Sequence, residues 1–329
     1  MPLDPIAYKP YADPDDFIRE VTDFIWVQRG IGFIRENYEA DSIVHTGYGT
    51  ITTRDEVIAG SLMRQAGPGA TRIGQAEDVV WEARGDDAFL SSHLILGAGP
   101  DNPYCSRTIA NCLYRRGRMV EEWVVRDNLA PALQAGLDPD EVARGKYFRG
   151  YLGSMTSAPP TDVLAAGDSG PRPDDYRSEC EMVLDFIQQV WNDRDLEKVT
   201  QFMPRDLFLN DIGYRTWIRP EGYRRALLRL LRPFPSGQFQ IRDIQTNYSV
   251  DYAGLRIAVC WVLVGDYDGQ ADFGPLTGQR TDLLGVSQFL VQNGKIMRET
   301  RIYDQIALRT QINAGRGDGA EPVPFANIY

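Results

Sequence analysis

The stretch Glu122-Trp123-Val124-Val125-Arg126-Asp127 has the composition of a β-strand that ends on a carboxylate. A related stretch, Glu299-Thr300-Arg301-Ile302-Tyr303-Asp304, recurs in the second half of the chain. In both copies a glutamine follows the aspartate by seven residues, at Gln134 and Gln311. Two copies of one strand-and-carboxylate unit indicate two copies of one domain.

Further short motifs keep the same order in the two halves. Each half begins with apolar residues at helical spacing and continues with strands separated by turns, which is an α+β order. A repeat as long as a domain predicts a fused pair of domains and excludes a solenoid. The aligned motifs are Asp41-xxx-His45 with Asp206-xxx-Asn210, Arg54-x-Glu56 with Arg219-x-Glu221, and His93 with Trp261, each four residues before a glycine.

The length of 329 residues is sufficient for two domains of about 150 residues each. A segment rich in Gly, Pro, Ser and Ala lies near the middle and reads as a linker. We therefore predict a first domain over residues 1–144, a linker over 145–175, a second domain over 176–313 and a C-terminal tail over 314–329.

Composition excludes several classes of partner. The net charge is -11, whereas nucleic-acid-binding proteins carry basic patches, so no nucleic-acid partner is expected. No apolar run approaches the roughly 18 residues that a membrane span requires, and the first residues lack the pattern of a signal peptide. We expect a cytoplasmic protein without a membrane partner.

The motifs resemble those of the SnoaL-like polyketide cyclase family in the NTF2-like superfamily. The second half has the clearer resemblance, and the first half follows it in fewer motifs. The second-half motifs are Val190-Trp191-Asn192, Leu231-Arg232-Pro233-Phe234-Pro235, Gly274-Pro275-Leu276-Thr277-Gly278 and Asp304 with Gln311; those of the first half are Asp41-xxx-His45, Gly117-Arg118, Trp123-xxx-Asp127 and Gln134-x-Gly136.

The resemblance implies two tandem cone-shaped barrels. In each, a strongly curved, mostly antiparallel sheet wraps around helices and leaves an apolar pocket open at one end. Members of the family often dimerise through the sheet, so a fused pair would form a pseudo-dimer within one chain. Assembly of several copies of the chain into a homo-oligomer is the other possibility that the resemblance leaves. The family's enzymes use no cofactor, and none is expected here.

Asp127 is the first candidate for a catalytic residue, at a position where the family has an aspartate. Trp123, Val125 and Asp127 share one face of the strand, since side chains alternate. Burial beside an apolar wall would raise the pKa of the Asp127 carboxyl towards the range useful for proton transfer. The alternative role is a cap of the following turn.

His45 and His93 are the two histidines of the chain, and both lie in the first half. Imidazole titrates near neutral pH, so each is a candidate partner of Asp127. Either could equally be an ordinary buried side chain. No spacing of His, Cys, Asp and Glu indicates a metal site.

Aromatic side chains complete the expected first-domain site, and the second domain has fewer acid–base groups. In the second domain Asn210 and Trp261 replace the two histidines, so we expect this domain to be structural or to complete the pocket of the first. The opposite assignment, with the active site in the second domain, stays open because the second half resembles the family more closely. The expected substrate-binding residues are Tyr48, Trp81, Tyr104, Tyr114 and Trp123, and the second-domain candidates are Asp304, Asp211, Tyr214 and Trp261.

These residues predict a cofactor-independent acid–base enzyme. Its substrate would be a small, largely apolar, aromatic or polyketide-like molecule with a carbonyl or hydroxyl group. Lyase, cyclase, isomerase and dehydratase reactions share this machinery. One alternative is a hydrolase of the epoxide type, which requires a second carboxylate near Asp127. Another is a module that binds a small molecule or assembles without catalysis.

Overall fold

Two six-stranded sheets form the framework of the computed structural model, which describes residues 3–66, 73–99, 102–151 and 176–319. Their strand orders are β2-β1-β6-β5-β4-β3 and β8-β7-β12-β11-β10-β9, so the two topologies are identical. In each sheet one central pair is parallel and the other pairs are antiparallel. The prediction of two tandem α+β units is confirmed.

The first unit places helices before and between its strands. Its first long helix begins where Asp13 caps the backbone N–H of Asp16 and Pro14 opens the first turn. The elements are α1 (Pro14–Thr22), the π-helical turn η2 (Asp23–Val27), α2 (Ile34–Asn37), β1 (Tyr38–Thr46), β2 (Gly49–Ile51), α3 (Arg54–Ala66), β3 (Ile73–Ala83), β4 (Ala88–Gly99), β5 (Asn102–Arg115), β6 (Arg118–Arg126), α4 (Leu129–Gln134) and α5 (Pro139–Arg144).

The second unit repeats this order, including a π-helical turn after its first helix. The short edge strands β2 and β8 were not predicted from sequence. The elements are α6 (Arg177–Phe186), the π-helical turn η6 (Ile187–Asn192), α7 (Val199–Phe202), β7 (Phe208–Asp211), β8 (Arg215–Ile218), α8 (Arg219–Leu231), β9 (Gln238–Ser249), β10 (Gly254–Asp266), β11 (Arg280–Gln292), β12 (Lys295–Tyr303) and α9 (Gln305–Gly315).

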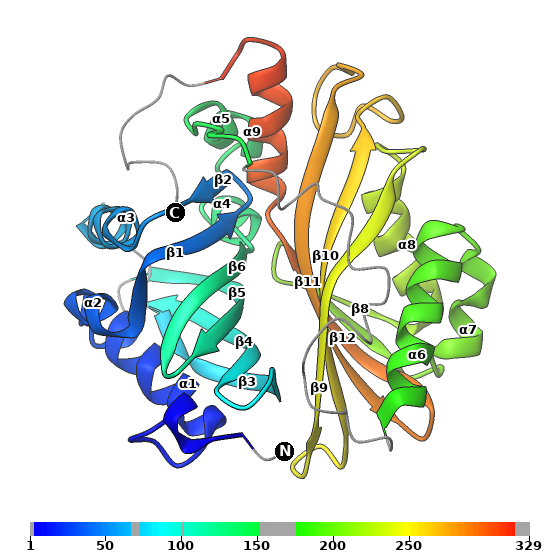
Figure 1. Ribbon diagram of the computed structural model, residues 1–329. Coiled ribbons are helices and arrows are strands. Elements are labelled where there is room, and N and C mark those ends of the chain that lie inside the picture. The colour runs from blue at the N-terminus through cyan, green and yellow to red at the C-terminus, as the bar shows by residue number, and fades with distance from the viewer. Residues whose placement is uncertain (1–2, 67–72, 100–101, 152–175, 320–329) are drawn as a thin grey trace.

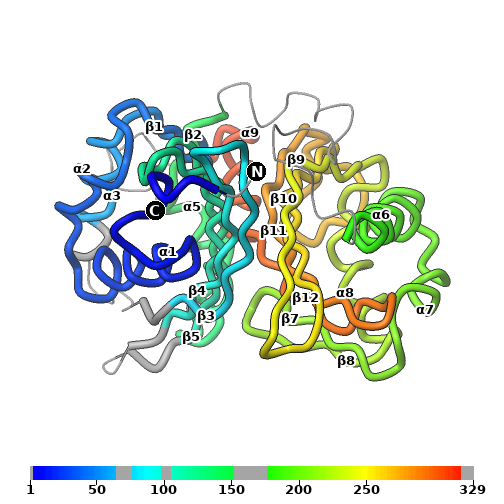
Figure 2. Tube along the Cα trace, turned by 60° about the horizontal axis from the view of Figure 1, so that its bottom comes forward, coloured from blue at the N-terminus to red at the C-terminus, as the bar shows by residue number. Residues whose placement is uncertain are grey.

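The two sheets lie back to back in the middle of the molecule, and most helices cover their outer faces (Figures 1 and 2). Apolar side chains from both sheets form one shared buried cluster between them. Both faces of each sheet are therefore buried. The cluster contains Leu90, Leu94, Ile109, Trp123 and Val125 from the first sheet and Cys260, Val262, Val264, Leu284, Val286 and Ile302 from the second.

Polar side chains also join the two sheets. Gln245 Nε2 donates to Asn111 Oδ1 at 2.6 Å, and both side chains are fully buried. Arg84 pairs with Asp243 at 2.9 Å, and Arg256 pairs with Asp78. These bonds satisfy polar groups that the apolar contact would otherwise bury without partners.

The helices that follow β6 and β12, the last strand of each unit, contact the opposite unit. After β6, Leu129 of α4 and Ala143 of α5 enter the hydrophobic core of the second unit. After β12, Ala307 of α9 packs against Gly47 of the first unit, where an added Cβ would lie 2.6 Å from Ala307 Cβ. This close approach requires a residue without a side chain at Gly47.

Residues 145–151, at the start of the expected linker, are held against both units. The Tyr151 hydroxyl donates to the carbonyl oxygens of Gly47 at 3.0 Å and Asp282 at 3.2 Å. Residues 152–175, and most of the expected tail, lie outside the described residues. Within the described part of the chain, no helix is long and apolar enough to span a membrane.

Aromatic rings fill the interior of the second unit. The Trp261 ring lies 5.8 Å from that of Trp191 and 5.1 Å from that of Phe239, and all three side chains are buried. Gly285 on the neighbouring strand makes room for the indole, because a Cβ there would lie 2.1 Å from Trp261 Cη2. The second unit is therefore a packed core.

We predict that Gly285→Ala lowers the free energy of unfolding by about 1–3 kcal/mol, because it forces the Trp261 indole to move within a packed core. The measurement is denaturant unfolding. Gly32→Ala is the control, since an added Cβ there meets no atom within 4 Å. In a Trp261→Phe background the cost should shrink, and an equal cost in both backgrounds would contradict this account.

Candidate functional site

The two faces of β6 point into different environments. Glu122, Val124 and Arg126 line a cavity inside the first unit, whereas Trp123 and Val125 belong to the cluster between the sheets. The expectation that Asp127, on the Trp123 face, lies in the pocket is therefore wrong.

Asp127 joins the two units through its carboxylate. Its Oδ1 accepts the backbone N–H of Ala130 at 3.1 Å and that of Gly213 at 2.8 Å, and its Oδ2 accepts that of Tyr214 at 3.0 Å. The first bond caps α4, which is the alternative role considered above, and the other two hold the β7–β8 turn. Burial raises the pKa of Asp127 to about 6, despite these bonds.

Asp304 has the matching position at the end of β12. Its Oδ1 accepts the backbone N–H of Ala307 and caps α9, and its Oδ2 accepts Nδ2 of Asn128 at 2.6 Å. Burial raises its pKa to about 6 as well. The two strand-end aspartates are thus related structural carboxylates at the contact between units, and Asp304 lines neither interior cavity.

Between about pH 4 and pH 6, we predict that the free energy of unfolding falls as pH rises, because Asp127 is protonated in the folded state and ionised in the unfolded chain. Asp127→Asn should reduce this slope by up to about 1.4 kcal/mol per pH unit. Denaturant unfolding at several pH values measures it. The exposed Asp251→Asn is the control, and equal slopes for wild type and Asp127→Asn would contradict the assignment.

His45, Tyr48 and Trp123 are also outside the first-unit cavity, contrary to prediction. His45 is fully buried, its Nε2 lies 2.8 Å from Glu121 Oε1, and its ring stacks on Trp123 at 5.4 Å. The Tyr48 hydroxyl accepts a hydrogen bond from Asn128 Nδ2 at 3.4 Å. His45 and Trp123 lie on the face of the sheet that packs against the second unit. Tyr48 lies in the turn between β1 and β2, and its partner Asn128 also bonds to Asp304 of that unit.

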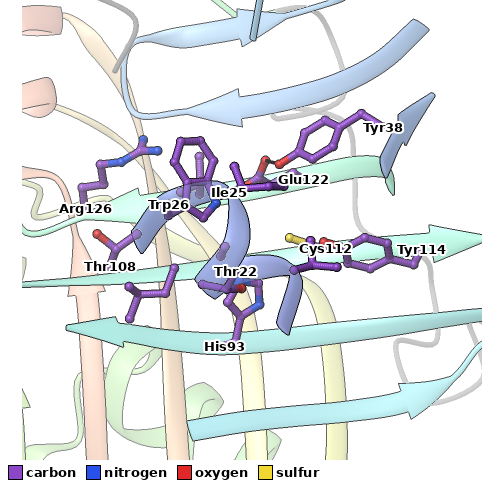
Figure 3. A pocket seen from close by; sticks show the side chains of 14 residues that line it. Thr22, Ile25, Trp26, Tyr38, His93, Thr108, Cys112, Tyr114, Glu122 and Arg126 are labelled. Atoms are coloured by element: carbon purple, nitrogen blue, oxygen red, sulfur yellow. Dashed lines mark hydrogen bonds between the residues drawn. The ribbon is translucent and has the colours of Figure 1, made fainter. Parts of the chain in front are cut away.

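The cavity in the first unit lies between the sheet and the first helix (Figure 3). Its volume is about 30 Å³, enough for one water molecule. Trp26, on the π-helical turn η2, forms part of its wall and is half-buried. Such turns are frequent at functional sites. Ile25 of the same turn also lines it, and the other lining residues come from α1, β4, β5 and β6, and from Tyr38 at the start of β1.

Glu122 supplies the one carboxyl group among the described residues that line this cavity. It is buried, and desolvation raises its pKa, although Arg126 and a hydrogen bond from Tyr38 act in the opposite direction. The Tyr38 hydroxyl donates to Glu122 Oε2 at 3.4 Å. Sequence reasoning passed over Glu122, although the repeat contained it: Glu299 occupies the matching position in β12.

His93 and Tyr114 line the same cavity, as predicted. The Nδ1 atom of His93 is buried and has no hydrogen-bond partner among the described residues. Burial, with a smaller contribution from the charge of Arg19, lowers the pKa of His93 to about 4. At neutral pH its imidazole is uncharged and has a free ring nitrogen.

We expect nuclear magnetic resonance to show that the His93 imidazole titrates near pH 4, because the low-dielectric cavity disfavours the charged form. His93→Gln identifies its signals by their loss. A midpoint near the ordinary value of about 6.5 would show that the side chain is solvated, and would remove the argument for a buried site.

Three further candidates lie elsewhere. Trp81 is partly buried against the first hydrophobic core and does not line the cavity. Tyr214 is 39% exposed, and the Arg107 guanidinium lies 4.2 Å above its ring. Tyr104 belongs to β5, but its side chain lies outside the part that the structure describes.

The pairing of strands within the sheets shows that His93 does not align with Trp261, although the sequence motifs suggest that it does. Glu122 pairs with Cys112, and Glu299 pairs with Phe289. On β5, the residue four positions before Cys112 is Thr108, which pairs with Ile95. On β11, the residue four positions before Phe289 is Gly285, which pairs with Trp261. Trp261 thus has the position of Ile95, and Val259 that of His93.

The matching positions explain why one interior is open and the other is filled. The second unit has Phe289 in place of Cys112 and Trp261 in place of Ile95. Its Glu299 is fully engaged: Tyr223 donates to Oε2 at 2.6 Å and Ser287 donates to Oε1 at 2.8 Å. The carboxyl group occurs in both units, but it lines a cavity in the first.

A second cavity, of about 100 Å³, lies at the end of the second unit. Of the second-domain candidates, Asp211 lines it, whereas Trp261 is part of the filled interior. Asp211 Oδ2 accepts Nε1 of Trp217 at 3.2 Å and lies 3.4 Å from the Arg301 guanidinium. No group of three or more His, Cys, Asp or Glu side chains in the described ranges is arranged to hold a metal ion.

Residues 181–312 match the family model described as SnoaL-like polyketide cyclase. A comparison with curated proteins finds no match.

Among solved structures, a proposed SnoaL-like polyketide cyclase from Jannaschia sp. CCS1 is 20% identical, with a TM-score of 0.37, and the match covers 42% of this chain and 92% of that one. A proposed polyketide cyclase from Acidithiobacillus ferrooxidans is 18% identical, with a TM-score of 0.36, over 42% of this chain and 96% of that one. A SnoaL-like polyketide cyclase from Agrobacterium tumefaciens is 17% identical, with a TM-score of 0.33, and the match covers 41% of this chain and 97% of that one.

Proposed function

We propose that the chain is a cofactor-independent acid–base enzyme whose site lies in its first unit; the match of residues 181–312 to the SnoaL-like polyketide cyclase family model supports the type of reaction. Its substrate is a small, largely apolar, aromatic or polyketide-like molecule with a carbonyl or hydroxyl group. Glu122 takes the role expected for Asp127, and His93 is its partner. The observation that carries the proposal is that one cavity is lined by a buried carboxyl and by an imidazole whose Nδ1 has no hydrogen-bond partner among the described residues.

The chemistry follows from the two environments. Desolvation raises the pKa of Glu122, which makes its carboxylate a stronger base towards a proton on the carbon beside a carbonyl group. The uncharged His93 imidazole donates a hydrogen bond to the carbonyl oxygen, where negative charge develops. Protonation of the enolate at another atom gives an isomer, and attack on a second carbonyl gives a ring.

The spacing between the two groups suits a ligand that lies across β5. His93 on β4 pairs with Ala110 on β5, and Ala110 pairs with Val124 on β6. Glu122 lies two residues before Val124 and on the same face of β6. Two strand spacings separate His93 from β6, or about 10 Å between backbones. A ligand larger than water requires the Trp26 side chain to move from the cavity wall, and its π-helical turn is where we expect that movement.

The second candidate function is binding without catalysis. The filled interior of the second unit favours it, because that unit keeps the fold without an open site. A hydrolase that activates water between two carboxylates has less support, because Glu122 is the one carboxyl group among the described lining residues. Binding and catalysis are distinguished by proton exchange.

The test uses acetophenone in deuterated water, in which loss of the methyl proton signal reports proton removal beside a carbonyl group. We expect the wild-type protein to accelerate this exchange, and Glu122→Gln to slow the catalysed rate by about 100-fold or more, which is the range for a lost general base. His93→Ala should lower it as well, by removing the donor to the carbonyl oxygen.

Glu121→Gln is the matched control, because Glu121 is the neighbouring residue on β6 and contacts His45 on the opposite face. It should retain the wild-type rate. A Glu122→Gln protein that exchanges as fast as wild type would refute the assignment. Acetophenone binding without any acceleration by the wild-type protein would favour the binding function.

A further inference from the structure

We propose that the second cavity, at the end of the second unit, binds a small oxyanion such as a carboxylate or a phosphate. Four arginines from three separate elements line it: Arg215 of β8, Arg229 and Arg232 at the end of α8, and Arg309 of α9. This inference does not depend on the function proposed for the first unit.

Charge pairing leaves two of these arginines without a counter-ion. Arg232 forms a two-pronged pair with Asp272, at 2.5 and 2.8 Å, and Arg309 pairs with Asp140. Among the residues that the structure describes, Arg215 and Arg229 have neither a hydrogen bond nor an ion pair from their guanidinium groups. In a chain of net charge -11, two unpaired guanidiniums at one cavity form a local positive site.

Asp211 also lines the cavity, and a neighbouring arginine offsets part of its charge. The guanidinium of Arg301, which is fully buried, lies 3.4 Å from Asp211 Oδ2. Arg301 also has Glu299 near it, but Glu299 does not line this cavity. Four arginines line the space against two carboxylates, Asp211 and Asp272, so the lining is positive on balance. Asp211 Oδ1 is buried and has no hydrogen-bond partner among the described residues, so the anion is expected to lie on the Arg215 and Arg229 side of the cavity.

Uncharged donors at the same cavity add directional hydrogen bonds. The Tyr303 side chain is buried and lines the space, and its hydroxyl makes no hydrogen bond to the described part of the chain. Gln305, two residues on, also lines it. Guanidinium, phenol and amide N–H or O–H groups are donors that suit carboxylate and phosphate oxygens.

The volume of about 100 Å³ limits the ligand to a few non-hydrogen atoms. Phosphate and a short dicarboxylate such as malonate both fall in this range, and both match the planar fork of arginine. Isothermal titration calorimetry of the full-length protein with sodium phosphate and, separately, with sodium malonate tests the site. The two titrations show whether it prefers a phosphate or a carboxylate. Chloride holds the ionic strength constant, because screening weakens any charge interaction.

We expect at least one of the two anions to bind, and Arg229→Gln and Arg215→Gln each to weaken that binding by about 10-fold or more, which corresponds to about 1.4 kcal/mol. Arg225→Gln is the matched control, since Arg225 is an exposed arginine on the same helix that does not line the cavity. It should bind within about twofold of wild type.

Three results would overturn the proposal. The first is that neither anion binds the wild-type protein more tightly than chloride does. The second is that Arg229→Gln and Arg215→Gln bind as tightly as wild type while thermal unfolding shows all variants folded. The third is that Arg225→Gln loses as much affinity as the other two, which would indicate non-specific attraction to surface charge.

Discussion

Burial of both faces of each sheet is the constraint on which the rest of the structure depends. One face packs on its own helices and the other packs on the opposite sheet through the cluster around Trp123, Val262 and Val286. Every strand in the middle of the molecule therefore contributes side chains to two interiors. Burying this apolar surface holds the two units together, and the crossing helices α4 and α9 extend the contact beyond the sheets.

This constraint explains what sequence could and could not predict. The order of motifs was enough to predict two α+β units of one fold, because strand periodicity and turns are local properties. The choice between the two faces of β6 is not local. Glu122 and Asp127 both lie beside apolar residues, and only the position of the second unit decides which carboxylate faces a cavity. The arginine cluster of the second cavity could not be predicted from the sequence either, because Arg215 and Arg309 lie far apart in it and only the fold brings them together.

The two units show how one fold can support two outcomes. Both keep a carboxyl group at the same strand position, Glu122 and Glu299, and both begin with a helix that ends in a π-helical turn. In the second unit Trp261 and Phe289 occupy the interior, and hydrogen bonds hold Glu299. In the first, smaller side chains at the matching positions leave Glu122 and His93 beside open space. The fold positions the carboxyl, and the neighbours decide whether it can meet a ligand.

We propose that the interior of the first unit admits a small molecule once Trp26 moves, and that the interior of the second unit does not. Fluorine NMR of the protein labelled with 5-fluorotryptophan tests it directly, with acetophenone as the ligand and single Trp→Phe variants for assignment. The account predicts that the Trp26 signal shifts during the titration while those of Trp191 and Trp261 stay constant. A shift at Trp191 or Trp261 with an unchanged Trp26 would contradict it.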